Sequence, residues 1–266
     1  MRSVSAAVIV TVAAMSFSSG LAAAAPKDYC ADLKGANTGS TCEIQLSDPA
    51  YSVDISIPLD YPDQKSVADY ISQTRDAFLA TAKSGAPSSP SATLSIKATE
   101  YNSAIPPRGT QAVVFTITQN VGGGPSKTTY KAFNWDQSYR KAITYTAAPD
   151  DKLNTPLWRV DDPLKTVAPI VASELQQQLA PPPPPAAPPT QPGQPATTTP
   201  SSTAPTTPPP PLAFAPGALY NPANYQNFAV VNDGVIFFFD QGALLPASAG
   251  ALHVLVPRSA IDPMIA

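Results

Sequence analysis

The stretch "NFAVVNDGVIFFFD", residues 227–240, decides how the rest of the chain must be arranged. It contains two apolar runs on either side of Asn232-Asp233-Gly234, which predicts a β-hairpin. Phe237, Phe238 and Phe239 put aromatic side chains on both faces of the second strand, because successive side chains alternate. With only one further short strand, in "LHVLVPRSAI" (252–261), such a hairpin is marginal in water. Its strands therefore need other elements to pack against.

Elements of the right kind precede the hairpin. "YSVDISIPLDYP" (51–62) alternates apolar and polar residues, which predicts a half-buried strand. Residues 63–85 follow with an amphipathic helical pattern, for which Asp63 is the expected N-cap. Three β-branched runs, at 92–103, 110–121 and 127–135, are separated by turn residues and predict an antiparallel meander.

A second helix is predicted in "DDPLKTVAPIVASELQQQLA" (161–180). Asp162 is the expected cap and Pro163 the first helical residue. Pro169 lies inside the apolar pattern, so we expect it to kink the helix or to delay its start.

The stretch "PPPPPAAPPTQPGQPATTTPSSTAPTTPPPP" (181–211) excludes helix and sheet and leaves extended polyproline II or disorder. The 55 residues after it lie near the lower limit for independent folding. We therefore expect residues 26–179 and 212–266 to form one discontinuous α+β domain, interrupted by a disordered Pro/Thr-rich insertion at 180–211. Its threonines suit O-glycosylation, and a bare loop is the alternative.

The first 26 residues, "MRSVSAAVIVTVAAMSFSSGLAAAAP", are typical of a secretory signal peptide (1–25) cleaved near Ala25. We expect a secreted protein without a transmembrane segment, free or associated with the cell wall. In such an oxidising setting Cys30 and Cys42 predict a disulfide, worth about 3 kcal/mol for so short a loop. A catalytic or metal-binding thiol is the alternative, which the presence of a single histidine disfavours.

Charge and motifs exclude several functions. The net charge is −3 with no cluster of lysine or arginine, which argues against nucleic acid and anionic membranes as partners. Neither a phosphate-binding loop, a Gly-x-Ser-x-Gly elbow nor zinc-ligand spacing is present, so we expect no metal and no cofactor.

Hydrolytic chemistry would have to use His253, with Ser259 and Asp262 as its nearest partners in the sequence. Nearness along a strand does not make three side chains converge, so we interpret His253 as a strand-end residue without a chemical role. If the protein is an enzyme, we expect a carboxylesterase.

Aromatic residues are the candidates for contact with a partner: Trp135, Tyr139, Tyr225 and Phe238. An exposed aromatic patch would mark an interaction site. The ordinary alternative is that the phenylalanines belong to a central strand covered by a helix.

Six segments carry a family resemblance: "APKDYCADLKG", "SDPAYSVDISIPLDYPDQKSVADYISQTRDAFL", "AIPPRGTQAVVF", "TTYKAFNWDQSYRK", "NYQNFAVVNDGVIFFF" and "VPRSAID". They resemble the mycobacterial secreted immunogenic proteins of the antigen sixty-four type. The C-terminal half is similar to the ectodomain of the lysozyme-sensing anti-sigma factor V. The resemblance implies a mixed, mainly antiparallel β-grasp-like sheet packed by two helices, with the insertion replacing a short loop.

The resemblance also implies a function at an interface. We expect a monomeric, non-enzymatic antigen linked to virulence, which binds a host or cell-wall protein or glycan. A sister branch described as cell-wall esterases supports the carboxylesterase alternative. The anti-sigma factor supports a third possibility, a module that binds lysozyme or peptidoglycan.

Overall fold

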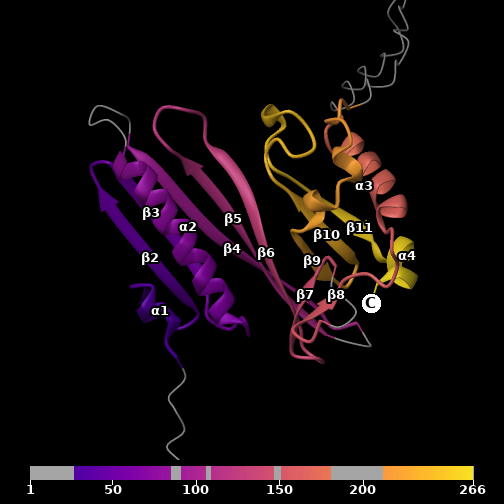
Figure 1. Cartoon of the computed structure of the whole chain (residues 1–266), viewed down its shortest axis with the longest axis horizontal. Coiled ribbons are helices and arrows are strands. Elements are labelled where there is room, and N and C mark those ends of the chain that lie inside the picture. Colours follow the sequence, from indigo (N-terminus) through magenta and orange to yellow (C-terminus); the bar gives the residue numbers. More distant parts are fainter. Residues whose placement is uncertain (1–26, 85–90, 106–108, 147–150, 181–211, 266) are drawn as a thin grey trace, which may run out of the picture.

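Two β-sheets stack face to face between two long helices (Figure 1). The computed structural model describes residues 27–84, 91–105, 109–146, 151–180 and 212–265. The predicted signal peptide and the Pro/Thr-rich insertion, apart from Ala180, lie outside these residues. In the described part of the chain, no helix is long and apolar enough to cross a membrane.

The first sheet has eight strands in sequence order: β1 (Ala36–Asn37), β2 (Thr41–Asp48), β3 (Tyr51–Pro58), β4 (Ala92–Ser103), β5 (Thr110–Asn120), β6 (Lys127–Asp136), β7 (Lys141–Thr144) and β8 (Asn154–Pro156). The predicted meander is confirmed as β4, β5 and β6, whose pairings are antiparallel. The β3–β4 and β7–β8 pairings are parallel. The sheet is thus mixed and mainly antiparallel, as expected.

Helix α2 (Gln64–Ser84) covers one face of this sheet. Its apolar side, including Ile71 and Phe78, packs on Ile55, Ile96 and Phe115. Asp63 caps the helix as predicted, since its carboxylate accepts a hydrogen bond from the backbone N–H of Ser66 at 3.1 Å.

A disulfide fastens the N-terminal segment to the same layer. Cys30 lies in the short helix α1 (Tyr29–Asp32) and is bonded to Cys42 on β2, which confirms the predicted pairing. Both cysteines are buried beside Ile44, so the bond joins α1 to the core under α2.

The hairpin predicted at 227–240 is present, but its strands do not extend the first sheet. Strands β9 (Phe228–Val231), β10 (Gly234–Phe239) and β11 (Leu252–Pro257) form a separate antiparallel sheet in the order β11-β10-β9. Gly234 at the turn has a φ of 152°, and a Cβ there would lie 2.0 Å from the carbonyl oxygen of Val256. Only glycine fits this turn without a backbone shift.

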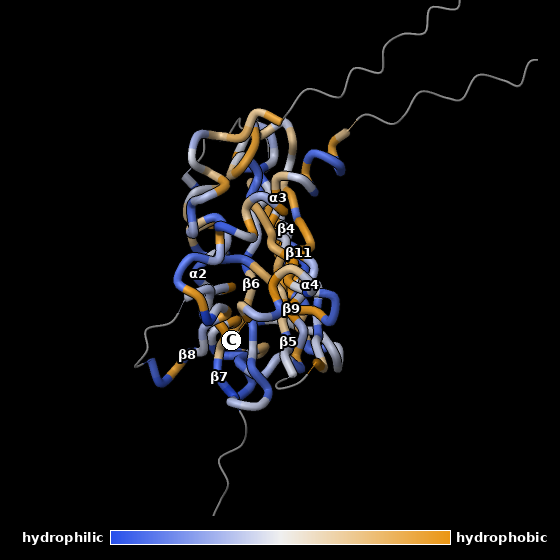
Figure 2. The backbone as a smooth tube through the Cα atoms, turned by 90° about the vertical axis from the view of Figure 1, so that its right-hand side faces the viewer, coloured by the Kyte–Doolittle hydropathy of each residue, from blue (hydrophilic) through white to orange (hydrophobic). Residues whose placement is uncertain are grey.

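The second helix, α3 (Leu164–Gln178), covers the outer face of this second sheet. Figure 2 shows hydrophobic stretches of β9 and β11 near α3 and the short helix α4 (Arg258–Ile261). Val167, Val171 and Leu175 of α3 are fully buried there. The prediction of Asp162 as the cap is wrong, because Pro163 occupies the N-cap position and no side chain caps the helix. The helix runs without interruption through Pro169.

Side chains join the two sheets where β9 crosses the first sheet. A small apolar cluster lies between them, with Ala112 and Val114 on one side and Ala229 and Phe238 on the other. Next to it, the open edge of β6 is bonded by side chains instead of another strand. Asn227 accepts from the N–H of Ala132 and donates to the carbonyl of Tyr130, at 3.0 and 2.9 Å. The carboxylate of Asp240 accepts from the N–H of Tyr130 at 2.7 Å.

Candidate functional site

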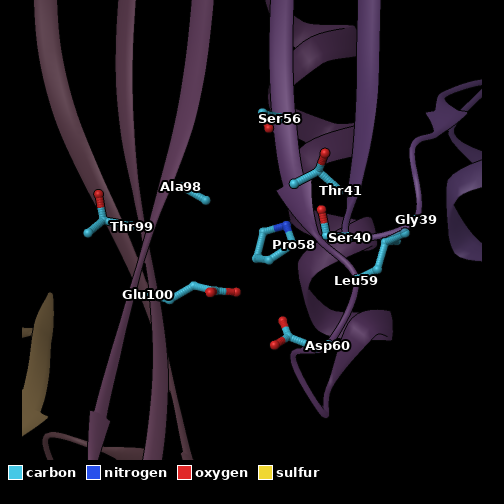
Figure 3. Close-up of a pocket in the computed structure, with 10 residues that line it drawn as sticks. All are labelled: Gly39, Ser40, Thr41, Ser56, Pro58, Leu59, Asp60, Ala98, Thr99 and Glu100. Carbon is cyan, nitrogen blue, oxygen red and sulfur yellow. The ribbon is translucent and has the colours of Figure 1, made fainter.

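The parting of β3 and β4 opens a cleft inside the first sheet. These strands pair in parallel only from Tyr51 opposite Ala92 to Ile55 opposite Ile96. Beyond that point they diverge, as Figure 3 shows. The resulting cleft has a volume of about 820 Å³, within the usual range of ligand-binding pockets.

Six of the ten residues that line this β3–β4 cleft are polar. The β4 wall consists of Ala98, Thr99 and Glu100. The opposite wall comes from the end of β3 and the turn before β2; it contains Gly39, Ser40, Thr41, Ser56, Pro58, Leu59 and Asp60. An ion pair between Lys97 and Asp54, at 2.7 Å, lies next to the point where the strands part.

Two carboxyl groups face each other across the cleft. Asp60 and Glu100 point toward one another from opposite walls (Figure 3). Partial burial raises the pKa of Glu100, and the hydrogen bond and negative charge of Asp60 raise it further. Two like charges held this close favour a bound cation or a shared proton. The cleft is therefore suited to a positively charged group.

The backbone edge of β4 is open along this cleft. From Lys97 to Ser103 the strand is paired with β5 on one side, and no described residue continues the β3 ladder on the other. Alternate residues of a strand direct their N–H and C=O groups to each side. The opposite wall is less available, because Pro58 has no N–H to donate and its carbonyl already accepts from the side-chain amide of Gln64 at 2.8 Å. The free edge of strand β4 is thus the one that can accept an added strand.

The residues considered for hydrolytic chemistry do not come together. His253 is exposed on β11 and stacks on Phe238, with ring centroids 6.1 Å apart. The carboxylate of Asp262 accepts a hydrogen bond from the guanidinium of Arg258 at 3.0 Å. Ser259 lies on α4, beyond the far end of β11, and no hydrogen bond links these three side chains in the described structure. This arrangement lacks the convergence that a catalytic triad requires.

The predicted aromatic contacts divide into two pairs. Trp135 and Tyr139 line a pocket of about 530 Å³, and Tyr139 is 66% exposed. The prediction for Tyr225 and Phe238 is corrected, because both side chains are buried. Tyr225 packs edge-on against Phe237, and Phe238 fills the junction of the two sheets, so neither forms a surface patch.

Two features of these sites were missed in the sequence. The pocket beside Trp135 gathers Arg140 and Lys141, which are adjacent in the chain, with Lys152, which is not. Asp60 and Glu100 lie 40 positions apart, with a helix between them. The available signal was the strand–helix–strand order of 51–103, which permits a parallel pairing and so brings the two ends near each other.

Comparison with known proteins finds matches over nearly the whole chain. It is 50% identical over 259 residues to the immunogenic protein MPB64 of Mycobacterium bovis and to MPT64 of Mycobacterium tuberculosis, covering 97% of this chain and 97% of each relative. It is 34% identical over 246 residues to a Mycobacterium tuberculosis protein named esterase Rv3036c, covering 92% of both chains.

A family of proteins of unknown function, DUF3298, matches residues 156–259, a range that includes α3 and β9–β11. Crystal structures of two DUF3298 proteins are similar to the chain. The one from Pseudomonas aeruginosa has a TM-score of 0.47 and 10% identity, covering 85% of this chain and 92% of its own. The one from Bacteroides fragilis has a TM-score of 0.44 and 11% identity, covering 87% and 96%.

Proposed function

The chain belongs to the family of the immunogenic proteins MPB64 and MPT64, and we propose that it is a secreted, non-enzymatic interaction protein. We further propose that it binds an extended, positively charged segment of a host or cell-wall protein in the β3–β4 cleft. The observation that carries the proposal is the open β4 edge beside two facing carboxyl groups.

The backbone edge and the two carboxyl groups make different contributions to binding. The backbone edge from Lys97 to Ser103 supplies hydrogen bonds to any extended chain, which gives affinity without sequence preference. Asp60 and Glu100 supply the preference, because they attract lysine or arginine and repel acidic side chains. Export is supported by the signal-peptide pattern and by the disulfide between Cys30 and Cys42, since disulfides persist in oxidising compartments.

A peptide experiment tests the cleft. We expect an eight-residue peptide of alternating lysine and threonine to bind the mature protein, measured by titration calorimetry at low salt. The double variant Asp60→Asn/Glu100→Gln should weaken binding about tenfold, since each exposed ion pair contributes up to about 1 kcal/mol. Binding should also fall on acidification, beginning at a higher pH than an ordinary glutamate would give, because the pKa of Glu100 is raised.

The controls separate the edge from the charge. A peptide N-methylated at alternate residues keeps its charge but loses the backbone donors that pair with a strand, so it should bind much more weakly. The variant Asp69→Asn/Asp76→Asn removes the same charge from the exposed side of α2 and should leave affinity unchanged. Equal binding of the methylated peptide, or equal loss in both double variants, would reduce the interaction to general electrostatics and refute the cleft.

A second candidate function is a carboxylesterase, which the 34% identity to a protein named an esterase favours. It would use His253 with a serine other than Ser259, because the structure separates these two residues. On the leading proposal we expect a fluorophosphonate probe to label no serine of the purified protein. Hydrolysis of a short-chain p-nitrophenyl ester that is abolished by His253→Ala would overturn the non-enzymatic proposal.

A module that binds lysozyme or peptidoglycan is the remaining alternative. This alternative also places the protein outside the cell, but it assigns a different binding partner. Co-sedimentation with purified cell walls that the variant Asp60→Asn/Glu100→Gln leaves intact would favour this alternative over the cleft.

A further inference from the structure

A third pocket, separate from the β3–β4 cleft and from the pocket beside Trp135, lies where the loop after β8 enters α3. It has a volume of about 350 Å³, near the lower end of the range for small-molecule sites. Tyr145 and Trp158 line it, and the short 3-10 helix η1 (Ala218–Tyr220) brings Tyr220 to the same pocket. It shares no lining residue with the cleft, so inferences about it do not depend on the function proposed above.

Two buried polar atoms in this pocket have no hydrogen-bond partner within the described structure. They are the hydroxyl of Tyr145 and the indole Nε1 of Trp158, whose side chains are only 3% and 5% exposed. Leaving such a group unpaired is unfavourable, so folded proteins satisfy nearly all of them. The two rings are neighbours, with centroids 6.2 Å apart, and the indole N–H lies close enough to influence the phenol without meeting the geometry of a hydrogen bond.

The chemistry of these two groups restricts what can satisfy them. Burial, and then the carboxylate of Asp162, raise the pKa of Tyr145 to about 12, with a smaller opposite effect of the Trp158 N–H. The phenol is therefore neutral at physiological pH and can both donate and accept. The indole N–H only donates. The two groups together suit a ligand oxygen that accepts from the indole and exchanges a hydrogen bond with the phenol.

The rest of the pocket adds acceptors and an aromatic surface. Asp161 and Asp162 are exposed and supply carboxylates, which accept hydrogen bonds from hydroxyl groups. Tyr220 is 59% exposed and so presents an accessible aromatic ring at the rim. Lys165 pairs with Asp162 at 3.2 Å, and Arg159 adds one positive charge against that of Asp161, so the pocket has no excess of positive charge.

The site is also rigid. Trp158 forms a β-bridge with Ile265, and the backbone N–H of Arg159 donates to the carbonyl of Met264 at 2.8 Å. The indole stacks on Phe237 with ring centroids 6.3 Å apart. Trp158 is therefore held in place on two sides, by the backbone bridge and by the ring of Phe237.

From these observations we propose that this pocket binds a neutral sugar. Ring hydroxyls would accept from Trp158, exchange a hydrogen bond with Tyr145 and donate to Asp161 or Asp162, while the apolar face of the ring packs on Tyr220. An anionic ligand would meet the carboxylate of Asp161, while that of Asp162 is already paired with Lys165 at 3.2 Å, and a cationic group has no acceptor for the indole N–H. A neutral polyhydroxylated ring is the ligand class that meets all four groups.

The chain permits a direct measurement because it has only two tryptophans. In a Trp135→Phe variant, Trp158 is the sole indole and reports its own environment. We expect its fluorescence to change in a saturable way with at least one of glucose, galactose, mannose, arabinose or N-acetylglucosamine. Saturation-transfer NMR with the unmodified protein provides a second readout that does not depend on emission.

The matched variants test the groups that carry the proposal. Tyr145→Phe keeps the ring and removes the unpartnered hydroxyl. It should weaken the affinity for the sugar that binds by about threefold to tenfold, the effect of losing one neutral hydrogen bond. Tyr51→Phe, on β3 in the other layer, should have no effect. The proposal is overturned by the absence of binding for the whole panel in both readouts, or by equal affinity of Tyr145→Phe. A crystal soaked in the panel that shows only a bridging water at Tyr145 and Trp158 would also overturn it.

Discussion

We expect the substitution Phe237→Ala to lower the free energy of unfolding by about 3–5 kcal/mol, as is typical when a fully buried phenylalanine is truncated. Phe237 is 0% exposed and is the aromatic centre of the second layer. Its ring lies 5.2 Å from that of Tyr225 and 6.3 Å from that of Trp158. Removing it leaves a cavity that these large, fixed rings cannot fill, so relaxation should recover little of the loss.

Chemical denaturation measures this effect as a shift in the midpoint at constant slope. Leu255→Ala is the matched control, because Leu255 is an apolar residue of the neighbouring strand β11 that is 39% exposed. It should cost well under 1 kcal/mol, in line with surface substitutions. Similar losses for the two variants would contradict the assignment of Phe237 to the core.

The local elements were largely predictable from the sequence. Period-two alternation located β3, and the Asn232-Asp233-Gly234 turn located the hairpin between β9 and β10. These signals depend on neighbouring residues only, so tertiary contacts seldom override them. The exception is Asp162, which has the right residue type for a cap but lies one position before Pro163, the actual N-cap of α3. Residue preference alone does not determine which of two adjacent positions begins a helix.

The association of the elements was less predictable. The hairpin was expected to find partners before residue 180, and it does so by face-to-face packing and side-chain bonds instead of an extended ladder. Asn227 forms hydrogen bonds to the open edge of β6, more than 90 positions earlier in the chain. Nothing in the sequence around an asparagine predicts such a role. The same applies to Asp60 and Glu100, which become neighbours only because β3 and β4 pair and then part. Contacts of this kind follow from the final packing and not from local pattern.

Cutting the chain within residues 181–211 should give two fragments that remain bound to each other. We propose that both sides of this stretch form a single domain, because α3 precedes it and yet covers β9–β11, which follow it. With a protease site inserted near position 200, we expect the two fragments to co-elute in size-exclusion chromatography without denaturant. Fragments that separate under native conditions would show that the chain has two independent domains.

The contact that should hold the fragments together can be broken selectively. Leu175 is fully buried on the side of α3 that faces the second sheet, so Leu175→Asp places an unpaired charge in the interface at a cost of several kcal/mol. After cleavage the covalent link no longer opposes this cost, and we expect the Leu175→Asp fragments to separate. Gln177→Asp makes the same kind of change on the exposed side of the helix, and its fragments should stay associated. Co-elution in both variants would mean that the junction around Asn227 and Phe238, and not α3, holds the two parts together.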